Sequence, residues 1–165
     1  MSILETRHQF WPDEAACAAS ANALAQRPGI HEAFIELEGP LGAGKTTFVR
    51  HLLHALGVRG RVKSPTYAVM EPYELPGSGS AGESAGKAAG AVWHFDFYRF
   101  NDPQEFEDAG FRDVFASTGL KLAEWPDKAA GLLPVADLVI AIEPTEGDER
   151  AVEFSARTLL GRGLL

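Results

Sequence analysis

The chain has 165 residues, 45% of them hydrophobic and 23% charged, which is the composition of an ordinary globular protein large enough to bury a core. Its formal net charge of −8 argues against a free-standing, non-specific nucleic-acid binder, because such a protein needs a positive field to meet phosphates. No apolar run approaches the ~20 residues of a membrane span, residues 1–10 lack the apolar core of a signal peptide, and one cysteine, Cys17, cannot form an internal disulfide. We therefore expect a cytoplasmic protein with a single domain over residues 1–165 and no membrane contact.

The N-terminal region predicts a short edge strand followed by a helix. Residues 4–10 carry a weak strand pattern. The Pro-Asp-Glu sequence at 12–14 then predicts a helix start, since proline is pre-set for the first turn and acids favour the positive end of the helix dipole. Residues 15–26 continue with strong helix formers, and a Pro-Gly pair ends the helix.

Residues 39–47 read Gly-Pro-Leu-Gly-Ala-Gly-Lys-Thr-Thr, the pattern of a phosphate-binding P-loop. Residues 33–38 before them have a strand pattern, and residues 48–56 after them carry apolar residues at helical spacing. In this context the glycines let backbone N–H groups turn inward and form an anion-binding nest. Lys45 places a positive charge at the β- and γ-phosphates, and the Thr46 hydroxyl is positioned to bind Mg²⁺. We predict that a nucleoside triphosphate is bound here, at a strand–loop–helix junction, by Gly39, Leu41, Gly42, Ala43, Gly44, Lys45, Thr46 and Thr47.

The segment after the P-loop helix carries a candidate switch residue and an insertion. Thr66 follows a proline at the place where switch threonines sense the γ-phosphate through Mg²⁺. The alternative is an ordinary strand threonine, since residues 66–75 alternate like a strand. Residues 76–90 are rich in glycine, serine and alanine and cannot bury enough apolar area to order themselves, so we expect a flexible insertion in a hairpin loop rather than a domain boundary.

The second half of the chain interleaves strands with short helices. Strand patterns cover residues 91–96, 119–123, 138–142 and 151–157, and helical patterns cover residues 102–108 and 111–116. Strands alternating with helices after a P-loop predict an α/β fold, a P-loop NTPase-like sheet with helices on both faces.

Two acids at predicted strand ends are the candidates to meet a metal ion. Asp96 ends one strand, and we expect it to be the Walker-B acid, which lies at the end of a strand beside the P-loop strand. Glu124 follows another strand, where open α/β sheets collect their ligand groups. Either acid alone is often only a helix cap, but two of them after a P-loop favour a site. We predict Thr46, Asp96 and Glu124 as metal ligands, and Lys45, Asp96, Glu124 and Thr66 as catalytic residues. We expect His94, between aromatics on a buried strand, to be a core residue rather than a ligand.

Taken together, the chain resembles one family, the small bacterial P-loop ATPase of tRNA threonylcarbamoyladenosine biosynthesis, called TsaE or YjeE. The resemblance rests on four motifs in chain order: residues 39–47, Ser-Pro-Thr-Tyr at 64–67, His-Phe-Asp-Phe-Tyr-Arg at 94–99, and Glu-Trp-Pro at 124–126. The chain departs from the family pattern at Pro40, at Tyr67 and in the longer insertion at 76–90, and none of these departures removes a functional group.

The resemblance implies hydrolysis of ATP with Mg²⁺, coupled to a partner complex of TsaB and TsaD type subunits. That complex makes a threonylcarbamoyl group and transfers it to an adenosine next to the tRNA anticodon, so this chain would meet tRNA indirectly. The resemblance also implies that Lys45 and Thr46 bind phosphate and Mg²⁺, that Asp96 and Glu124 serve the metal and the hydrolysis step, and that Thr66 is a switch. We expect Trp125, directly after Glu124, to contact the partner.

Other functions stay open beside this one. Residues 34–47 also look like the start of a thymidylate-type nucleotide kinase, which needs an arginine-bearing lid, but the middle of the chain has no Asp-Arg-Tyr segment. A nucleotide-gated interaction subunit that barely hydrolyses ATP is the other alternative, since isolated P-loop proteins are slow until a partner completes the site. A GTPase is disfavoured because the chain has no Asn-Lys-x-Asp stretch for guanine. Phe10 and Trp11 are candidates to stack on adenine, although no sequence motif supports either residue.

Overall fold

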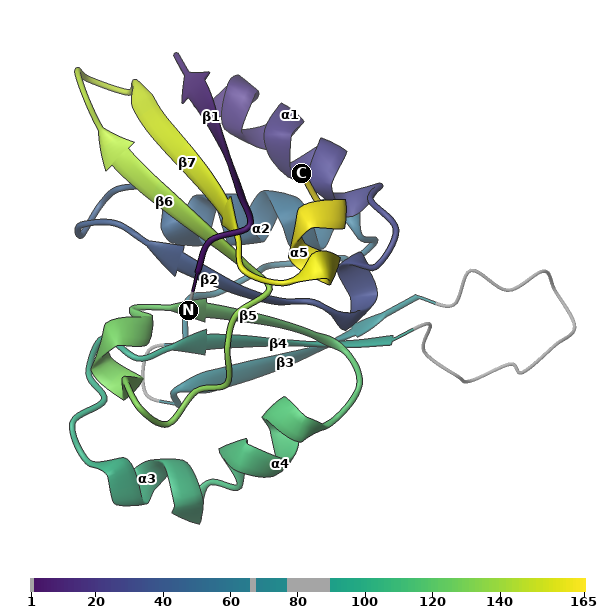
Figure 1. Ribbon diagram of the computed structural model, residues 1–165, viewed down its shortest axis with the longest axis vertical. Coiled ribbons are helices and arrows are strands. Elements are labelled where there is room, and N and C mark those ends of the chain that lie inside the picture. Colours follow the sequence, from purple (N-terminus) through teal and green to yellow (C-terminus); the bar gives the residue numbers. More distant parts are fainter. Residues whose placement is uncertain (1, 66–67, 77–89) are drawn as a thin grey trace, which may run out of the picture.

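The computed structural model describes residues 2–65, 68–76 and 90–165, and within these residues seven strands form one sheet in the order β1-β7-β6-β2-β5-β4-β3 (Figure 1). The strands are β1 (Glu5–Trp11), β2 (Phe34–Glu38), β3 (Met70–Leu75), β4 (Gly90–Asp96), β5 (Leu120–Glu124), β6 (Leu138–Pro144) and β7 (Arg150–Ala156). Strands β6, β2, β5 and β4 are parallel to one another, whereas β7, β1 and β3 run antiparallel to their neighbours. The α/β prediction is confirmed, with antiparallel strands at both edges of a parallel centre.

The predicted hairpin around the insertion has its two strands in place. Strands β3 and β4 pair antiparallel, with Leu75 opposite Gly90. Residues 77–89 between them lie outside the described residues, and so does Thr66, the predicted switch. The predicted N-terminal strand is confirmed as an edge, because β1 pairs only with β7 in the described sheet.

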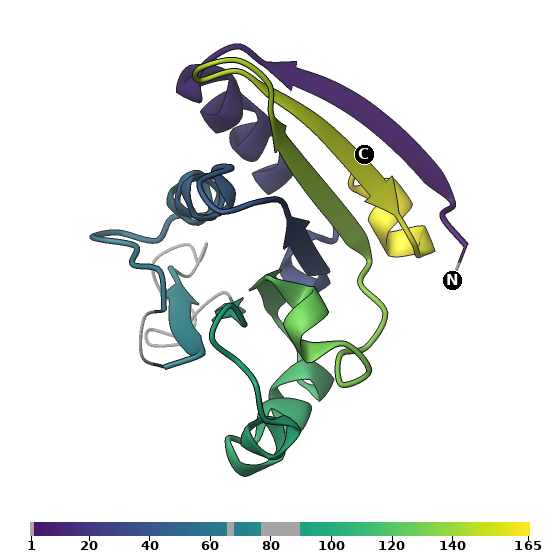
Figure 2. The same ribbon diagram turned by 90° about the vertical axis from the view of Figure 1, so that its left-hand side faces the viewer.

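Helices cover the sheet on both faces. The longer ones are α1 (Glu14–Ala25) and α2 (Lys45–Ala55), and the shorter ones are α3 (Pro103–Asp108), α4 (Phe111–Ala116), α5 (Leu159–Gly163) and the 3₁₀ helices Ile30–Glu32 and Pro126–Ala129. Figure 2 shows α1 and α2 side by side on one side of the sheet, with α3 and α4 at the other end of the molecule. No helix within the described ranges is long and apolar enough to cross a membrane.

Local capping explains where these helices begin. Asp13 is the N-cap of α1 and accepts a hydrogen bond from the Ala16 N–H at 2.9 Å, so Pro12 lies just before the cap rather than in the first turn. Asp102 caps α3 in the same way, with Pro103 at its first position. Helix α5 was not predicted from the sequence, because two of its five residues are glycines. It forms nevertheless, since the Thr158 hydroxyl accepts from the Gly161 N–H at 3.0 Å.

Two cores of different character lie on the two faces. The core under α1, α2 and α5 is largely aliphatic, with Ile35, Leu37, Leu52 and Leu122 fully buried. The core under α3 and α4 is aromatic, and Phe95 stacks there on Phe115 with 4.7 Å between ring centroids. Burying each such side chain contributes about 1.5–3 kcal/mol, so both layers hold the sheet rigid. Within the described residues no helix lies over the outer face of β1 and β7. Five side chains on this face are exposed, Thr6, His8, Phe10, Ala151 and Glu153, whereas Ser155 on the same face is buried.

The parallel centre decides where the polar residues meet. Because β2, β4 and β5 run in one direction, their carboxyl ends lie at the same edge of the sheet. The strand register sets Leu37 beside Glu124 and Glu124 beside Asp96. The two predicted acids are therefore neighbours on adjacent strands. The expectation that the strand of Asp96 lies beside the P-loop strand was wrong, because β5, which carries Glu124, lies between β2 and β4.

Candidate phosphate and metal site

The loop between β2 and α2 has the backbone that a phosphate nest needs. Gly39, Gly42 and Gly44 all have positive φ, and Gly44, at φ 106°, is the residue that precedes the first turn of α2. At Gly39 a Cβ would lie 2.5 Å from the carbonyl oxygen of Ile142, so no other residue fits. The loop therefore opens onto the N-terminus of an eleven-residue helix, which favours anions.

Lys45 is buried against its own loop. Its side chain is only 5% exposed, and its ammonium donates to the carbonyl of Gly39 and, at 3.1 Å, to that of Pro40. Burial lowers the pKa of Lys45, while the charges of Glu124, Asp96 and Asp127 act in the opposite direction. These carboxylates compensate part of the cost of holding a cation here.

The Thr46 hydroxyl and Glu124 lie in direct contact. Thr46 Oγ1 donates to both carboxylate oxygens of Glu124, at 2.9 and 3.0 Å. Glu124 is 2% exposed, and its Oε2 lies 2.6 Å from Nε2 of His94, which is fully buried. His94 is thus a core residue, as predicted, but its Nε2 contacts Glu124, one of the predicted metal ligands. Sequence reasoning missed this contact, although alternation along β4 places His94 on the same face as Asp96.

Asp96 lies beside this pair with its own partners. Its Oδ2 accepts from the Ser64 hydroxyl at 3.2 Å, and its Oδ1 accepts from the Tyr98 N–H at 3.0 Å. Burial raises the pKa of Asp96 and the nearby charge of Glu124 raises it further, although the hydrogen bonds from Tyr98 and Ser64 lower it. The carboxyl of Asp96 is therefore more basic than an exposed aspartate.

A cavity of about 280 Å³ joins these groups. Seven of the eight predicted phosphate-binding residues line it, and the eighth, Gly39, lines another cavity, together with Leu37 and Trp125. The remaining lining residues are Ser64, Asp96, Tyr98, Glu124 and Trp125. The structure thus brings together Lys45, Thr46, Asp96 and Glu124 from the predicted set, whereas Thr66 is outside the described residues.

The donor set at this cavity suits a magnesium ion that is shared with phosphates. No group of three or more His, Cys, Asp and Glu side chains in the described ranges could hold a metal on its own. Magnesium bound with a nucleotide takes only one or two protein oxygens and completes its shell with phosphates and water. The Thr46 hydroxyl and the Glu124 carboxylate, in contact at the mouth of the nest, are such a pair.

Trp125 forms one wall of the cavity in an unusual backbone conformation. Its φ of 55° is the one positive value found for a non-glycine residue in the described part of the chain. Lys45 Nζ lies 3.9 Å from the centroid of a Trp125 ring. The ring centroids of Tyr98 and Trp125 are 4.9 Å apart. The aromatic face therefore covers the P-loop lysine.

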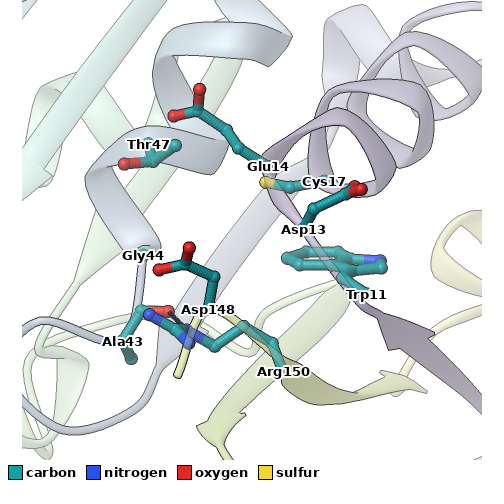
Figure 3. Close-up of a pocket in the computed structure, with 9 residues that line it drawn as sticks. All are labelled: Trp11, Asp13, Glu14, Cys17, Ala43, Gly44, Thr47, Asp148 and Arg150. Atoms are coloured by element: carbon teal, nitrogen blue, oxygen red, sulfur yellow. Dashed lines mark hydrogen bonds between the residues drawn. The ribbon is translucent and has the colours of Figure 1, made fainter. Parts of the chain in front are cut away.

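A second cavity of about 360 Å³ continues from the nest on the side of α1 (Figure 3). It shares Ala43, Gly44 and Thr47 with the first cavity. The β1–α1 corner lines the rest of it, together with the hairpin between β6 and β7, through Trp11, Asp13, Glu14, Cys17, Asp148 and Arg150. A molecule in the nest can thus extend into a space that the sequence did not reveal.

Trp11 and Arg150 define this second cavity. The Trp11 ring is stacked on Phe48 with 5.6 Å between centroids, whereas Phe10 is 56% exposed on the outer face of β1. Of the two aromatic candidates, Trp11 is therefore the one at the cavity. Arg150 donates to the P-loop carbonyl of Ala43 at 2.8 Å, which ties the β6–β7 hairpin to the nest (Figure 3). Cys17 is buried there, and burial raises the pKa of its thiol to about 11.

Fold and loop together place this chain in the P-loop class of α/β proteins. The chain belongs to the TsaE family, because the family model for threonylcarbamoyl adenosine biosynthesis protein TsaE matches residues 11–152. A tRNA threonylcarbamoyladenosine biosynthesis protein TsaE from Haemophilus influenzae is 36% identical over 98% of this chain and 97% of its own. The protein of the same name from Bacillus subtilis is 34% identical over 88% of this chain and 81% of its own. The fold is similar to the crystal structure of Bacillus subtilis YdiB, with a TM-score of 0.75, 23% identity, and 99% and 94% of the two chains covered.

Proposed function

We propose that this protein hydrolyses ATP with Mg²⁺ and that hydrolysis supports a protein complex which adds threonylcarbamoyl to a tRNA adenosine next to the anticodon. The observation that carries the ATPase part is the contact of Thr46 with Glu124 at the mouth of the P-loop nest. A hydroxyl at a helix start beside a strand-end acid is the arrangement that holds Mg²⁺ in P-loop enzymes. The role in tRNA modification is supported by the family and by the names of the relatives.

ATP would occupy both cavities. The nest and Lys45 would hold the phosphates, and the adjoining cavity would hold the sugar and base against Trp11. A flat aromatic face already fixed by its stacking on Phe48 favours a planar base.

The reacting end would be organised by two carboxylates with different environments. Thr46 and Glu124 would hold the metal, which supplies neutralising charge to the phosphates when bound. Asp96 is held by Ser64 and Tyr98 in the same cavity, and its raised pKa suits it to orient the attacking water and accept its proton. Lys45 would exchange its bonds to Gly39 and Pro40 for bonds to phosphate oxygens.

Those bonds of Lys45 also support a slow enzyme that needs its partner. The ammonium is satisfied by two loop carbonyls and covered by Trp125, so contact with a γ-phosphate competes with existing interactions. This observation keeps a nucleotide-gated interaction subunit as the second candidate. Subunits of TsaB and TsaD type are the proposed partners, in the cytoplasm, with tRNA bound through them rather than by this acidic chain. Membership of the TsaE family gives no support to a thymidylate-type kinase.

The test is ATP turnover of the purified chain, alone and with the partner complex from the same organism. We expect slow phosphate release from the chain alone and a clear increase when the partner is added. Magnesium-dependent nucleotide binding without turnover under either condition would favour the interaction subunit. Neither binding nor turnover in wild-type protein would refute the proposal.

A further inference from the structure

We infer that His94 is a positioning residue, which holds the Glu124 carboxylate where it meets Thr46 and so sets how tightly Mg²⁺ is bound with nucleotide. This inference rests on the proposed function, because it concerns the metal end of the same site. His94 itself does not line the cavity; it acts through Glu124.

The sheet register places the two side chains together. In the parallel pairing of β4 with β5, His94 lies beside Leu122 and Asp96 beside Glu124. His94 thus reaches diagonally along one face of the sheet, and its Nε2 comes within 2.6 Å of Glu124 Oε2. His94 is 0% and Glu124 2% exposed, so no bulk water competes for this bond.

The direction of the bond follows from the partners of Glu124. Both of its oxygens accept from the Thr46 hydroxyl. We therefore assign His94 Nε2 as the donor of its bond to Glu124 Oε2. When Thr46 turns to a metal ion, the bond from His94 is the one side-chain hydrogen bond within the described residues that remains to hold the carboxylate.

The other ring nitrogen argues against a purely packing role. His94 Nδ1 is buried and has no hydrogen-bond partner among the described residues. A leucine or phenylalanine would fill the site without burying an unpaired acceptor. The contact with Glu124 is the feature that neither of these residues would supply.

The experiment uses two amide substitutions that separate the two ring nitrogens. His94→Gln carries an N–H donor near the position of Nε2, whereas His94→Asn carries its amide near the position of Nδ1, out of reach of Glu124. His94→Leu removes both. Phe95→Leu is the matched control, since Phe95 is the next residue of β4, is also fully buried, and packs in the aromatic core on the opposite face.

Binding of a fluorescent ADP analogue is measured with and without Mg²⁺, together with melting temperature and the Mg²⁺ dependence of turnover. In His94→Asn and His94→Leu we expect metal-free affinity within about twofold of wild type and a Mg²⁺ requirement about 10–100-fold higher, the usual cost of losing a group behind a metal ligand. His94→Gln should recover most of the Mg²⁺ affinity. Phe95→Leu should lower the melting temperature and leave the Mg²⁺ requirement unchanged.

The inference is overturned if His94→Asn and His94→Gln need the same Mg²⁺ concentration as wild type, whatever their melting temperatures. It is also overturned if His94→Gln and His94→Asn raise the Mg²⁺ requirement equally, because the position of the N–H donor then does not matter. Should His94→Leu not fold, the Gln and Asn pair still decides. Absence of Mg²⁺-dependent binding and turnover in wild type is a different result, which removes the proposed function itself and the inference with it.

Discussion

The ammonium of Lys45 lies 3.9 Å from the centre of a Trp125 ring, so the aromatic residue that directly follows Glu124 covers the lysine of the P-loop. The two residues come from different elements, one from the start of α2 and the other from the turn after β5. If Lys45 moves to bind a phosphate, its contact with Trp125 changes. The position of Trp125 is thereby linked to the cavity at the P-loop.

Trp125→Ala is expected to weaken partner-stimulated turnover and tRNA modification more than ATP binding. The truncation removes the cover of Lys45 and an aromatic surface at the cavity wall, and losses of about 2 kcal/mol or more are common for such anchors. ATP affinity, partner binding and modification should be measured on one preparation. Collapse of ATP affinity with partner binding intact would instead make Trp125 part of the nucleotide pocket.

Lys45→Ala should lower ATP turnover by on the order of 100-fold or more, because no other described cation lines the phosphate cavity. Lys128→Ala, at an exposed lysine nearby on the 3₁₀ helix, is the control and should turn over normally. Phosphate release at saturating ATP is the measurement. A Lys45→Ala rate within twofold of wild type would show that the nest is not the catalytic phosphate site.

Glu124→Gln keeps the size of the side chain but loses the charge that Mg²⁺ needs. We expect turnover to fall by about 100-fold while metal-free ATP affinity stays within a few-fold of wild type, since Lys45 and the loop N–H groups still hold the phosphates. Titration of ATP in EDTA and in Mg²⁺ measures both quantities. Normal turnover in this variant would leave Glu124 with a structural role only.

Asp96→Asn should raise the melting temperature at pH 7 while lowering turnover. Burial and the charge of Glu124 raise the pKa of Asp96, so the folded protein binds this proton more tightly than the unfolded chain does. Ionised Asp96 therefore costs stability, and the cost sets in as pH rises through the folded pKa and is absent below the ordinary value of 3.8. The gain in melting temperature should be largest near neutrality and vanish toward pH 4. If the variant is less stable than wild type at pH 7, the hydrogen bonds from Ser64 and Tyr98 stabilise ionised Asp96 by more than burial and the charge of Glu124 destabilise it.

Trp11→Ala should reduce ATP affinity by about tenfold, within the 1–3 kcal/mol range of a base–aromatic stack. Affinity for inorganic tripolyphosphate, which has no base, should not change, and this comparison removes any general effect of the lost packing on Phe48. Phe10→Ala, at the exposed neighbour, is the control. Equal losses for ATP and tripolyphosphate would place the base elsewhere.

The sequence by itself determined the features that depend on local rules. The P-loop was predicted because glycine spacing dictates a backbone with positive φ, and the observed φ values at Gly39, Gly42 and Gly44 agree. The strands that end at Asp96 and Glu124 were predicted because alternation and apolar runs mark β structure over a few residues. That both acids reach one edge follows from parallel strands after a P-loop, so their meeting was predicted too.

Only the tertiary structure decided which residues meet across the sheet and between distant segments. Trp11 and Arg150 line one cavity from opposite ends of the chain, and no pattern in either segment refers to the other. The bond from His94 to Glu124 depends on the register of β4 with β5, and a shift of one residue would turn His94 to the opposite face. Helix α5 forms because Thr158 caps it and Leu160 packs against the core, which outweighs the low helix propensity of its glycines. For the cavity and for the His94–Glu124 bond, the deciding energy comes from packing and hydrogen bonds between residues far apart in sequence, whereas a sequence pattern reports only what neighbours along the chain prefer.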